Sequence, residues 1–178
     1  MNRRFATPLA LAACVATLLA AVVLAAPRLA PAGPAMAPAG SLPATQVAYL
    51  TSCGGCHGIE GTSAPGSVPT LRGLTGTFLC TRQGRDFLIR LPDVALSTLS
   101  DRMLTQVMNF VVFDLGAPVA GGRSVPRYTV AEVARLRHEP LTDTGLTVYR
   151  NRVVAGLAAR CAVPAALHVY AARVAVAR

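Results

Sequence analysis

Apolar residues recur at helical spacing in three stretches of the central chain, residues 45–52, 76–91 and 100–115. Within each stretch they fall on one side of a helix with 3.6 residues per turn, which leaves polar residues for the other side. The residues expected to face a core are Val47, Tyr49, Leu50, Phe78, Leu79, Phe87, Leu88, Leu91, Leu104, Met108, Val111 and Val112. The pattern predicts an all-α fold.

Capping and breaking residues mark the ends of these helices. Ser100 is placed as the N-cap of the third stretch, and Asp101 follows it where a negative charge favours the helix dipole. Gln83 and Gly84 predict a break that divides the second stretch into short helices.

Residues 116–178 predict a C-terminal helical extension. After a loop rich in Gly and Pro, Thr129 and Glu132 have the spacing of a capping box that opens a short helix. A longer helix is expected over residues 143–159, and residues 165–178 carry only a weak apolar stripe.

The N-terminal residues 1–26 are typical of an export signal. Arg3 and Arg4 form a short positive region, and a long uncharged run of Ala, Leu and Val follows. We expect cleavage near Ala25. Two alternatives stay open, an uncleaved N-terminal membrane anchor and a lipid-modified Cys14. Each of them delivers the following chain to the oxidising, periplasmic side of the membrane.

Residues 27–41 are rich in Pro, Ala and Gly and predict a linker. The folded part therefore begins near Leu42. At 178 residues the chain is long enough for one domain with extensions.

The net positive charge of the chain favours some kinds of binding partner over others. The formal net charge is +9, and all 17 basic residues are arginines. This balance favours redox partners with an acidic docking surface, or anionic membranes. It does not favour nucleic acid, because no basic run, aromatic platform or nucleic-acid motif accompanies the charge.

The candidate chemistry lies in Cys53-Gly54-Gly55-Cys56-His57. Two cysteines separated by two residues and followed by histidine have the spacing of a c-type haem attachment site. Each thiol can form a thioether with a haem vinyl group, and the imidazole can bind the iron. A zinc site is the weaker interpretation, since the remaining cysteines and histidines do not form a second compact pair.

Residues 42–115 resemble a class I cytochrome c domain, a small helical fold around one covalent haem. The resemblance rests on a helix that leads into the Cys53–His57 motif, a Gly- and Pro-rich loop, and then Pro69, Leu71 and Gly73 in the order that this family shows. It implies that the Pro69 carbonyl accepts the Nδ1 proton of His57 and that Leu71 packs against the haem. It also implies that Phe110, on the closing helix, packs against the first helix.

The sequence departs from this family at the sixth iron ligand. The family commonly places a methionine in the loop before the closing helix, but residues 91–99 contain neither sulfur nor imidazole. Met108 is one candidate ligand, and Met103 is the less favoured alternative. His138 and His168 are more remote candidates. An iron with five ligands, or with a displaceable sixth, is the other interpretation.

Cys80 and Cys161 are left over from the motif. In an oxidising compartment they could close a disulfide that ties the extension to the haem domain. Two free thiols are the alternative.

The sequence predicts an electron carrier rather than an enzyme. No Ser/His/Asp set, carboxylate pair or phosphate loop stands out. The first interpretation is a periplasmic cytochrome that transfers single electrons. The alternative is a haem protein with an open or displaceable sixth site that serves as a small-ligand binder, a sensor or a redox-enzyme subunit.

Overall fold

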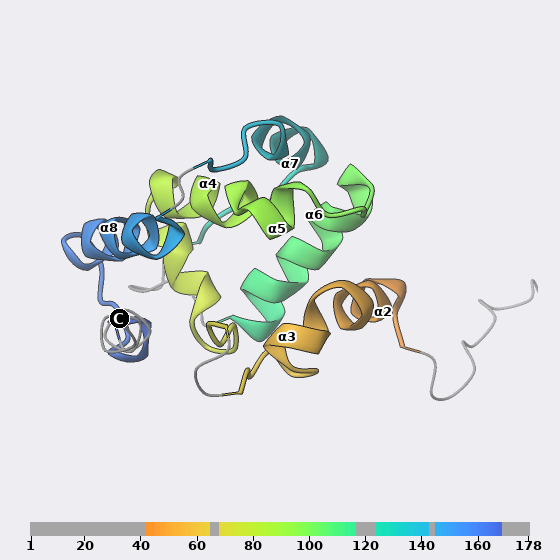
Figure 1. The fold of residues 1–178 in the computed structure, drawn as a ribbon, viewed down its shortest axis with the longest axis horizontal. Coiled ribbons are helices and arrows are strands. Elements are labelled where there is room, and N and C mark those ends of the chain that lie inside the picture. Colours follow the sequence, from red (N-terminus) through yellow and green to blue (C-terminus); the bar gives the residue numbers. More distant parts are fainter. Residues whose placement is uncertain (1–41, 65–67, 117–123, 143–144, 169–178) are drawn as a thin grey trace, which may run out of the picture. The chain divides into compact units, whose positions relative to one another are not determined.

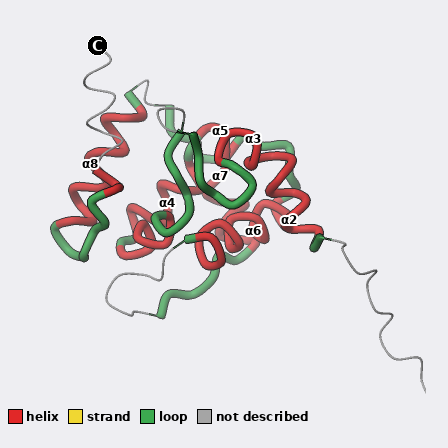
Figure 2. Tube along the Cα trace, turned by 90° about the horizontal axis from the view of Figure 1, so that it is seen from below, coloured by secondary structure: helices red, strands yellow, loops and turns green. Residues whose placement is uncertain are grey.

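The computed structural model describes residues 42–64, 68–116, 124–142 and 145–168. All of these residues belong to one compact unit that begins at Leu42. The predicted signal, anchor, linker and final segment beyond residue 168 lie outside the described residues. All regular secondary structure within those residues is helical, which confirms the predicted all-α class (Figures 1 and 2).

The first helical path leads into the cysteine motif. It consists of α2 (Ala44–Tyr49), one π-helical turn η1 (Leu50–Gly54) and the short α3 (Gly55–His57). The helix was expected to end just before Cys53, whereas the helical path continues to His57. Gly58 then ends it with a positive φ of 78°.

The buried face of α2 differs from the predicted one. Tyr49 and Ala48 are buried, Leu50 is half-buried, and Val47 is 45% exposed. Residues two apart in a helix point about 200° apart, so Val47 and Tyr49 cannot face the same core. Tyr49 takes the inward position, and its ring meets the Phe110 ring edge to face at a centroid distance of 5.5 Å.

The middle of the chain forms α4 (Arg82–Arg90), α5 (Pro92–Ala95) and α6 (Asp101–Asn109). A 3₁₀ turn, η2 (Thr75–Cys80), precedes α4, and a π-helical turn, η3 (Phe110–Leu115), continues α6. Figure 1 shows α6 running across the centre of the molecule, with α2 and α4 on either side.

The stretch divides into two short helical pieces, as predicted, but the break lies at Thr81 and not at Gln83-Gly84. Helix α4 runs through both residues and begins instead after Thr81, whose hydroxyl accepts a hydrogen bond from the Gly84 backbone N–H at 3.1 Å. Gly84 is buried, and a Cβ at this position would collide with the Phe78 carbonyl oxygen. The glycine therefore serves the close approach of α4 and η2 rather than a turn.

Helices α7 (Val130–Arg137) and α8 (Leu146–Ala158) share one core with residues 42–115. Helix α4 contacts both of them (Figure 1). The Phe87 ring stacks on Phe78 at 5.6 Å and on Tyr149 of α8 at 5.9 Å. The described part of the extension thus packs as part of the same body.

A disulfide joins Cys80, at the end of η2, to Cys161, just after α8, with a Cα–Cα distance of 6.6 Å. Of the two alternatives left open by the sequence, the structure has the bridged one. None of the helices in the described residues is long and apolar enough to cross a bilayer.

Candidate haem-attachment site

The two motif cysteines lie on one side of the helical path. Cys53 and Cys56 are three residues apart, and His57 is four residues after Cys53, so their side chains leave neighbouring positions of the helix surface. Both cysteines are free thiols, Cys53 half-buried and Cys56 exposed. Burial raises the pKa of the Cys53 thiol. The site therefore offers two unpaired sulfurs, in contrast to Cys80 and Cys161.

His57 has a defined tautomer. Its Nδ1 lies 2.9 Å from the Pro69 carbonyl oxygen. A carbonyl oxygen can only accept a hydrogen bond, so Nδ1 carries a proton, and in the neutral imidazole Nε2 then keeps its lone pair. The family resemblance implied this hydrogen bond, and the structure contains it. The imidazole is thus oriented as a metal-ligating histidine normally is, through its other ring nitrogen.

The loop after the motif is held by hydrogen bonds to its backbone carbonyl groups. The Tyr49 hydroxyl donates to the Gly58 carbonyl oxygen at 2.7 Å and holds the end of the helical path. Further along, the Gly61 carbonyl oxygen accepts from the backbone N–H groups of Leu71 and Arg72 at 2.8 and 2.9 Å. These bonds bring the segment that contains Pro69 and Leu71 back beside the motif.

Sequence reasoning missed the parts played by Tyr49 and Gly61. Tyr49 was expected only as a core residue, and its hydroxyl bond to Gly58 has no sequence signature. Gly61 has a positive φ of 80°, which its identity as glycine allows without strain. The two glycines shortly after His57, Gly58 and Gly61, were the available signal for a tightly folded loop.

The two candidate methionines differ in their surroundings. Met108 is 6% exposed and belongs to the buried core with Leu104 and Val111. Met103 is half-buried at the first turn of α6 and packs against the margin of that core. His138 and His168 are exposed, at the end of α7 and beyond α8.

Several apolar side chains are partly exposed at the edge of the core instead of being enclosed by it. They come from the motif helix, from the segment after Pro69, from the chain between α4 and α6 and from the first turn of α6. These residues are Leu50, Leu71, Leu74, Leu91, Val94, Leu99 and Met103. A flat apolar group such as haem would remove such surface from water.

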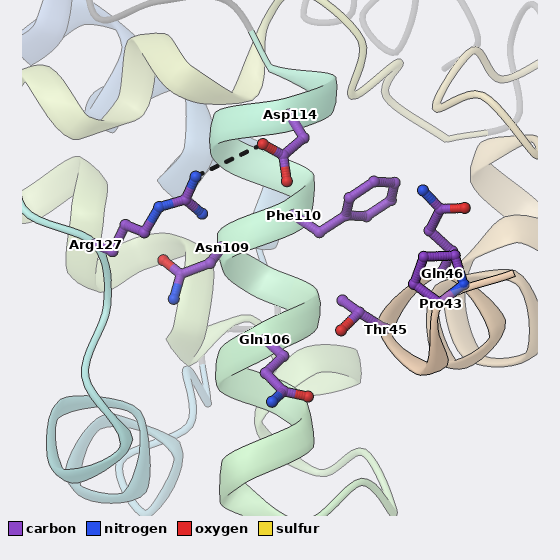
Figure 3. A pocket seen from close by; sticks show the side chains of 8 residues that line it. All are labelled: Pro43, Thr45, Gln46, Gln106, Asn109, Phe110, Asp114 and Arg127. Carbon is purple, nitrogen blue, oxygen red and sulfur yellow. Dashed lines mark ion pairs between the residues drawn. The ribbon is translucent and has the colours of Figure 1, made fainter. Parts of the chain in front are cut away.

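A pocket lies elsewhere, between the start of α2 and the α6–η3 helix (Figure 3). Arg127 faces Asp114 across one end of it, with 3.6 Å between Nη2 and Oδ1. Its lining residues are Pro43, Thr45, Gln46, Gln106, Asn109, Phe110, Asp114 and Arg127. None of them belongs to the motif or to the Pro69–Leu71 segment, so this pocket is not the candidate haem site.

The described residues contain no cluster of three or more His, Cys, Asp or Glu side chains that could chelate a metal ion. The motif thus does not form an ion-binding cage of the zinc type. Free thiols at the attachment spacing, a histidine with an available Nε2 and a margin of partly exposed apolar side chains fit covalent haem.

Comparison of the chain with family models, with curated proteins and with solved structures finds no match.

Proposed function

We propose that this protein is a c-type cytochrome that carries one haem on Cys53 and Cys56, with His57 as the proximal iron ligand. The observation that carries the proposal is the 2.9 Å hydrogen bond between His57 Nδ1 and the Pro69 carbonyl oxygen. This bond gives the histidine directly after the two free thiols the tautomer that an iron ligand needs. Once bound, haem c supplies an iron that gains and loses a single electron.

The chain's own residues would orient and shield the group. The Pro69 carbonyl holds the imidazole in place and increases its basicity through the shared Nδ1 proton. Leu71 and the other residues of the apolar margin would exclude water from the haem faces. None of these roles requires a catalytic acid or base, which agrees with electron transfer as the activity.

A periplasmic location is part of the proposal. The predicted export signal of residues 1–26 supports it, and a disulfide such as Cys80–Cys161 persists in an oxidising compartment. Without the export signal, which holds Arg3 and Arg4, 15 arginines against 8 acidic residues leave a formal charge of +7, which supports redox partners with an acidic docking surface. Their rate of electron exchange should fall as salt is added, and a rate indifferent to ionic strength would count against such a surface.

A second candidate function is reversible binding of a small molecule at the sixth iron position. Its support is that residues 96–100, which lead into α6, contain no sulfur or imidazole, while Met108 is enclosed in the core. Between the methionines, Met103 is the better candidate ligand because it lies at the margin.

The test of haem attachment is to produce the chain with a periplasmic cytochrome c maturation system and to stain a denaturing gel for covalent haem. Wild type should stain, and a Cys53→Ser, Cys56→Ser double variant should not. The matched control is a Cys80→Ser, Cys161→Ser double variant, which removes the same number of cysteines and should keep the stain. Wild-type protein without covalent haem would refute the proposal.

The test between the two functions is the optical spectrum of the reduced protein with and without carbon monoxide. Rapid binding by wild type supports the open-site function. A spectrum that the gas leaves unmoved in wild type but shifts in a Met103→Ala variant supports a methionine-ligated electron carrier. Met108→Ala is the control for loss of a methionine from the core.

A further inference from the structure

The loop between α5 and α6 is organised by one side chain from the C-terminal extension. This loop, residues 96–100, occupies the place where the class I resemblance expects the sixth ligand. It lies between two helices and is itself irregular. Carbonyl groups in and around such a loop need partners that no regular helix supplies.

Arg137, the last residue of α7, binds three of these carbonyl groups. Its Nε donates to the Ala95 oxygen at 3.0 Å, Nη2 to the Ser97 oxygen at 2.5 Å and Nη1 to the Leu99 oxygen at 2.8 Å. Nη1 also lies 2.8 Å from Oδ1 of Asp101. All three nitrogens of the guanidinium group are therefore engaged with alternate residues of one short segment.

The chemistry of arginine suits this arrangement. A guanidinium group presents five N–H donors in one rigid plane, whereas lysine offers a single flexible ammonium. The Arg137 side chain is only 14% exposed, and the Asp101 carboxylate balances its charge. Hydrogen bonds that involve a charged donor and are shielded from water are among the stronger ones in proteins.

Two side chains of the loop have contacts of their own, because the Ser100 hydroxyl accepts from the Met103 N–H at 3.3 Å and Leu99 packs against the core. The Ser97 hydroxyl is buried and has no hydrogen-bond partner among the described residues. Leu96 is exposed. The chain just after Arg137 is held against α4. The Arg90 side chain donates from Nε to the Glu139 carbonyl oxygen at 2.6 Å, and the Arg90 carbonyl oxygen accepts from the Leu141 N–H at 2.8 Å.

We infer that Arg137 is a positioning residue that holds the 96–100 loop, and with it the start of α6, in the conformation that sets the sixth-ligand side of the haem. The inference rests on the proposed function and assigns a role to α7 of the extension. Met103 follows this loop by three residues. Release of the loop would therefore change how readily Met103 reaches the iron, or how open the sixth iron position is to small molecules.

Arg85 provides a matched control. It also ties α7 to α4, through a two-point pair with Glu132 at 2.6 and 2.8 Å, and donates to the Pro126 carbonyl oxygen at 2.8 Å. Its side chain is 12% exposed, close to the value for Arg137. Its partners lie outside the 96–100 loop. Loss of Arg85 should weaken α7 without releasing the loop.

The experiment compares wild type, Arg137→Met, Arg137→Lys and Arg85→Met in the full chain. Amide hydrogen exchange is measured over residues 96–104, and the holoprotein is examined by its reduction potential and its rate of carbon monoxide binding. We expect Arg137→Met to raise loop exchange at least tenfold and to shift both haem properties. Arg137→Lys should restore them in part, and Arg85→Met should leave them at wild-type values.

The readouts separate this inference from the proposed function. Unchanged loop exchange in Arg137→Met, or equal acceleration in Arg85→Met, overturns the inference even if haem is attached. Faster loop exchange with unaltered potential and carbon monoxide rate overturns the role at the haem. Wild-type protein without covalent haem overturns the proposed function and that role together, while exchange still decides whether Arg137 holds the loop. If Arg137→Met does not fold, loop exchange, reduction potential and carbon monoxide rate are measured on Arg137→Lys and Asp101→Asn. The same outcomes then support or overturn the inference.

Discussion

At the scale of single residues, Tyr49 connects the core to the candidate haem site. Its ring is almost fully buried against Phe110, and its hydroxyl bonds the Gly58 carbonyl where the helical path ends. Desolvation raises the pKa of the hydroxyl, so it stays a neutral donor at physiological pH. One side chain thereby fixes both the inner face of α2 and the residue next to His57.

Tyr49→Phe should destabilise the protein by about 1–2 kcal/mol, because the Gly58 carbonyl loses its donor while the ring still fills its place. Denaturant unfolding of the holoprotein measures this change. Tyr149→Phe is the control, since the stacking of that ring on Phe87 does not depend on the hydroxyl. Equal losses in the two variants would contradict the role given to the Tyr49 hydroxyl.

The sequence could predict the His57–Pro69 contact but not the Arg137 contacts. The first followed from an ordered motif in one loop, where residue types and their order are the signal. Arg137 bonds carbonyl groups that are 38 to 42 residues away in the chain. Any residue type presents the same backbone oxygen, so no pattern of side chains marks such an acceptor.

At the scale of helices, local caps could be predicted and close packing could not. The Ser100 and Thr129 hydroxyls accept from the N–H groups of Met103 and Glu132, as the sequence indicated. The side chain of Glu132 differs from the expected capping box, because it pairs with Arg85 of α4. Caps depend on neighbours in the chain, whereas a cross-helix partner depends on the completed fold.

The glycines of α4 and α8 give a test of helix packing. Gly84→Ala should cost about 1–3 kcal/mol or more, because the new Cβ would meet the Phe78 carbonyl. Gly156→Ala in α8 is the matched change, with Gln83 Oε1 at 3.8 Å as the nearest neighbour. It should be neutral or stabilise the protein by up to about 1 kcal/mol. Thermal unfolding measures both, and a tolerated Gly84→Ala would contradict the tight α4–η2 approach.

The Arg85–Glu132 pair predicts a dependence of stability on pH. The hydrogen bond from Arg85 holds the pKa of the Glu132 carboxyl below its usual value. A lowered folded-state pKa means that the pair contributes its stability above the unfolded-state pKa of about 4.3 and loses it as the pH falls further. Near neutral pH the contribution should be about 1–2 kcal/mol, since both side chains are mostly buried.

Unfolding of wild type and Glu132→Gln across the acidic range measures that contribution. The difference in free energy of unfolding should be largest near pH 6–7 and should shrink below about pH 4, where Glu132 becomes protonated. A difference that stays constant to pH 2–3 would show that the charge of Glu132 is not responsible.

At the scale of the whole molecule, the extension completes the core of residues 42–115. Helices α7 and α8 bury Val133, Leu136, Val153 and Leu157 in the same cluster that contains Tyr49 and Met108. The sequence indicated both ends of α7 and the end of α8, whereas α8 begins at Leu146 and not at the expected residue 143. It could not indicate that they share a core, since an apolar stripe does not specify which other stripe it meets.

Removal of the disulfide should destabilise the protein by about 2–5 kcal/mol, because the bridge spans 81 residues and restricts the unfolded chain. The Cys80→Ser, Cys161→Ser double variant and denaturant unfolding measure this loss. Alkylation of the denatured protein before and after reduction gives the pairing directly. Two thiols that react without reduction, in addition to any from the motif, would contradict it.

The long span of this disulfide has a consequence for biogenesis. If the chain is exported from its N-terminus, as proposed, Cys53, Cys56 and Cys80 would reach the oxidising compartment before Cys161. Of the single disulfides that these four cysteines can form, only Cys80–Cys161 leaves both Cys53 and Cys56 reduced, as thioether formation requires. During export the first three can pair wrongly while the proper partner of Cys80 is still absent. We expect the yield of holoprotein to depend on a thiol reductant that acts during translocation, and less so for the Cys80→Ser, Cys161→Ser variant.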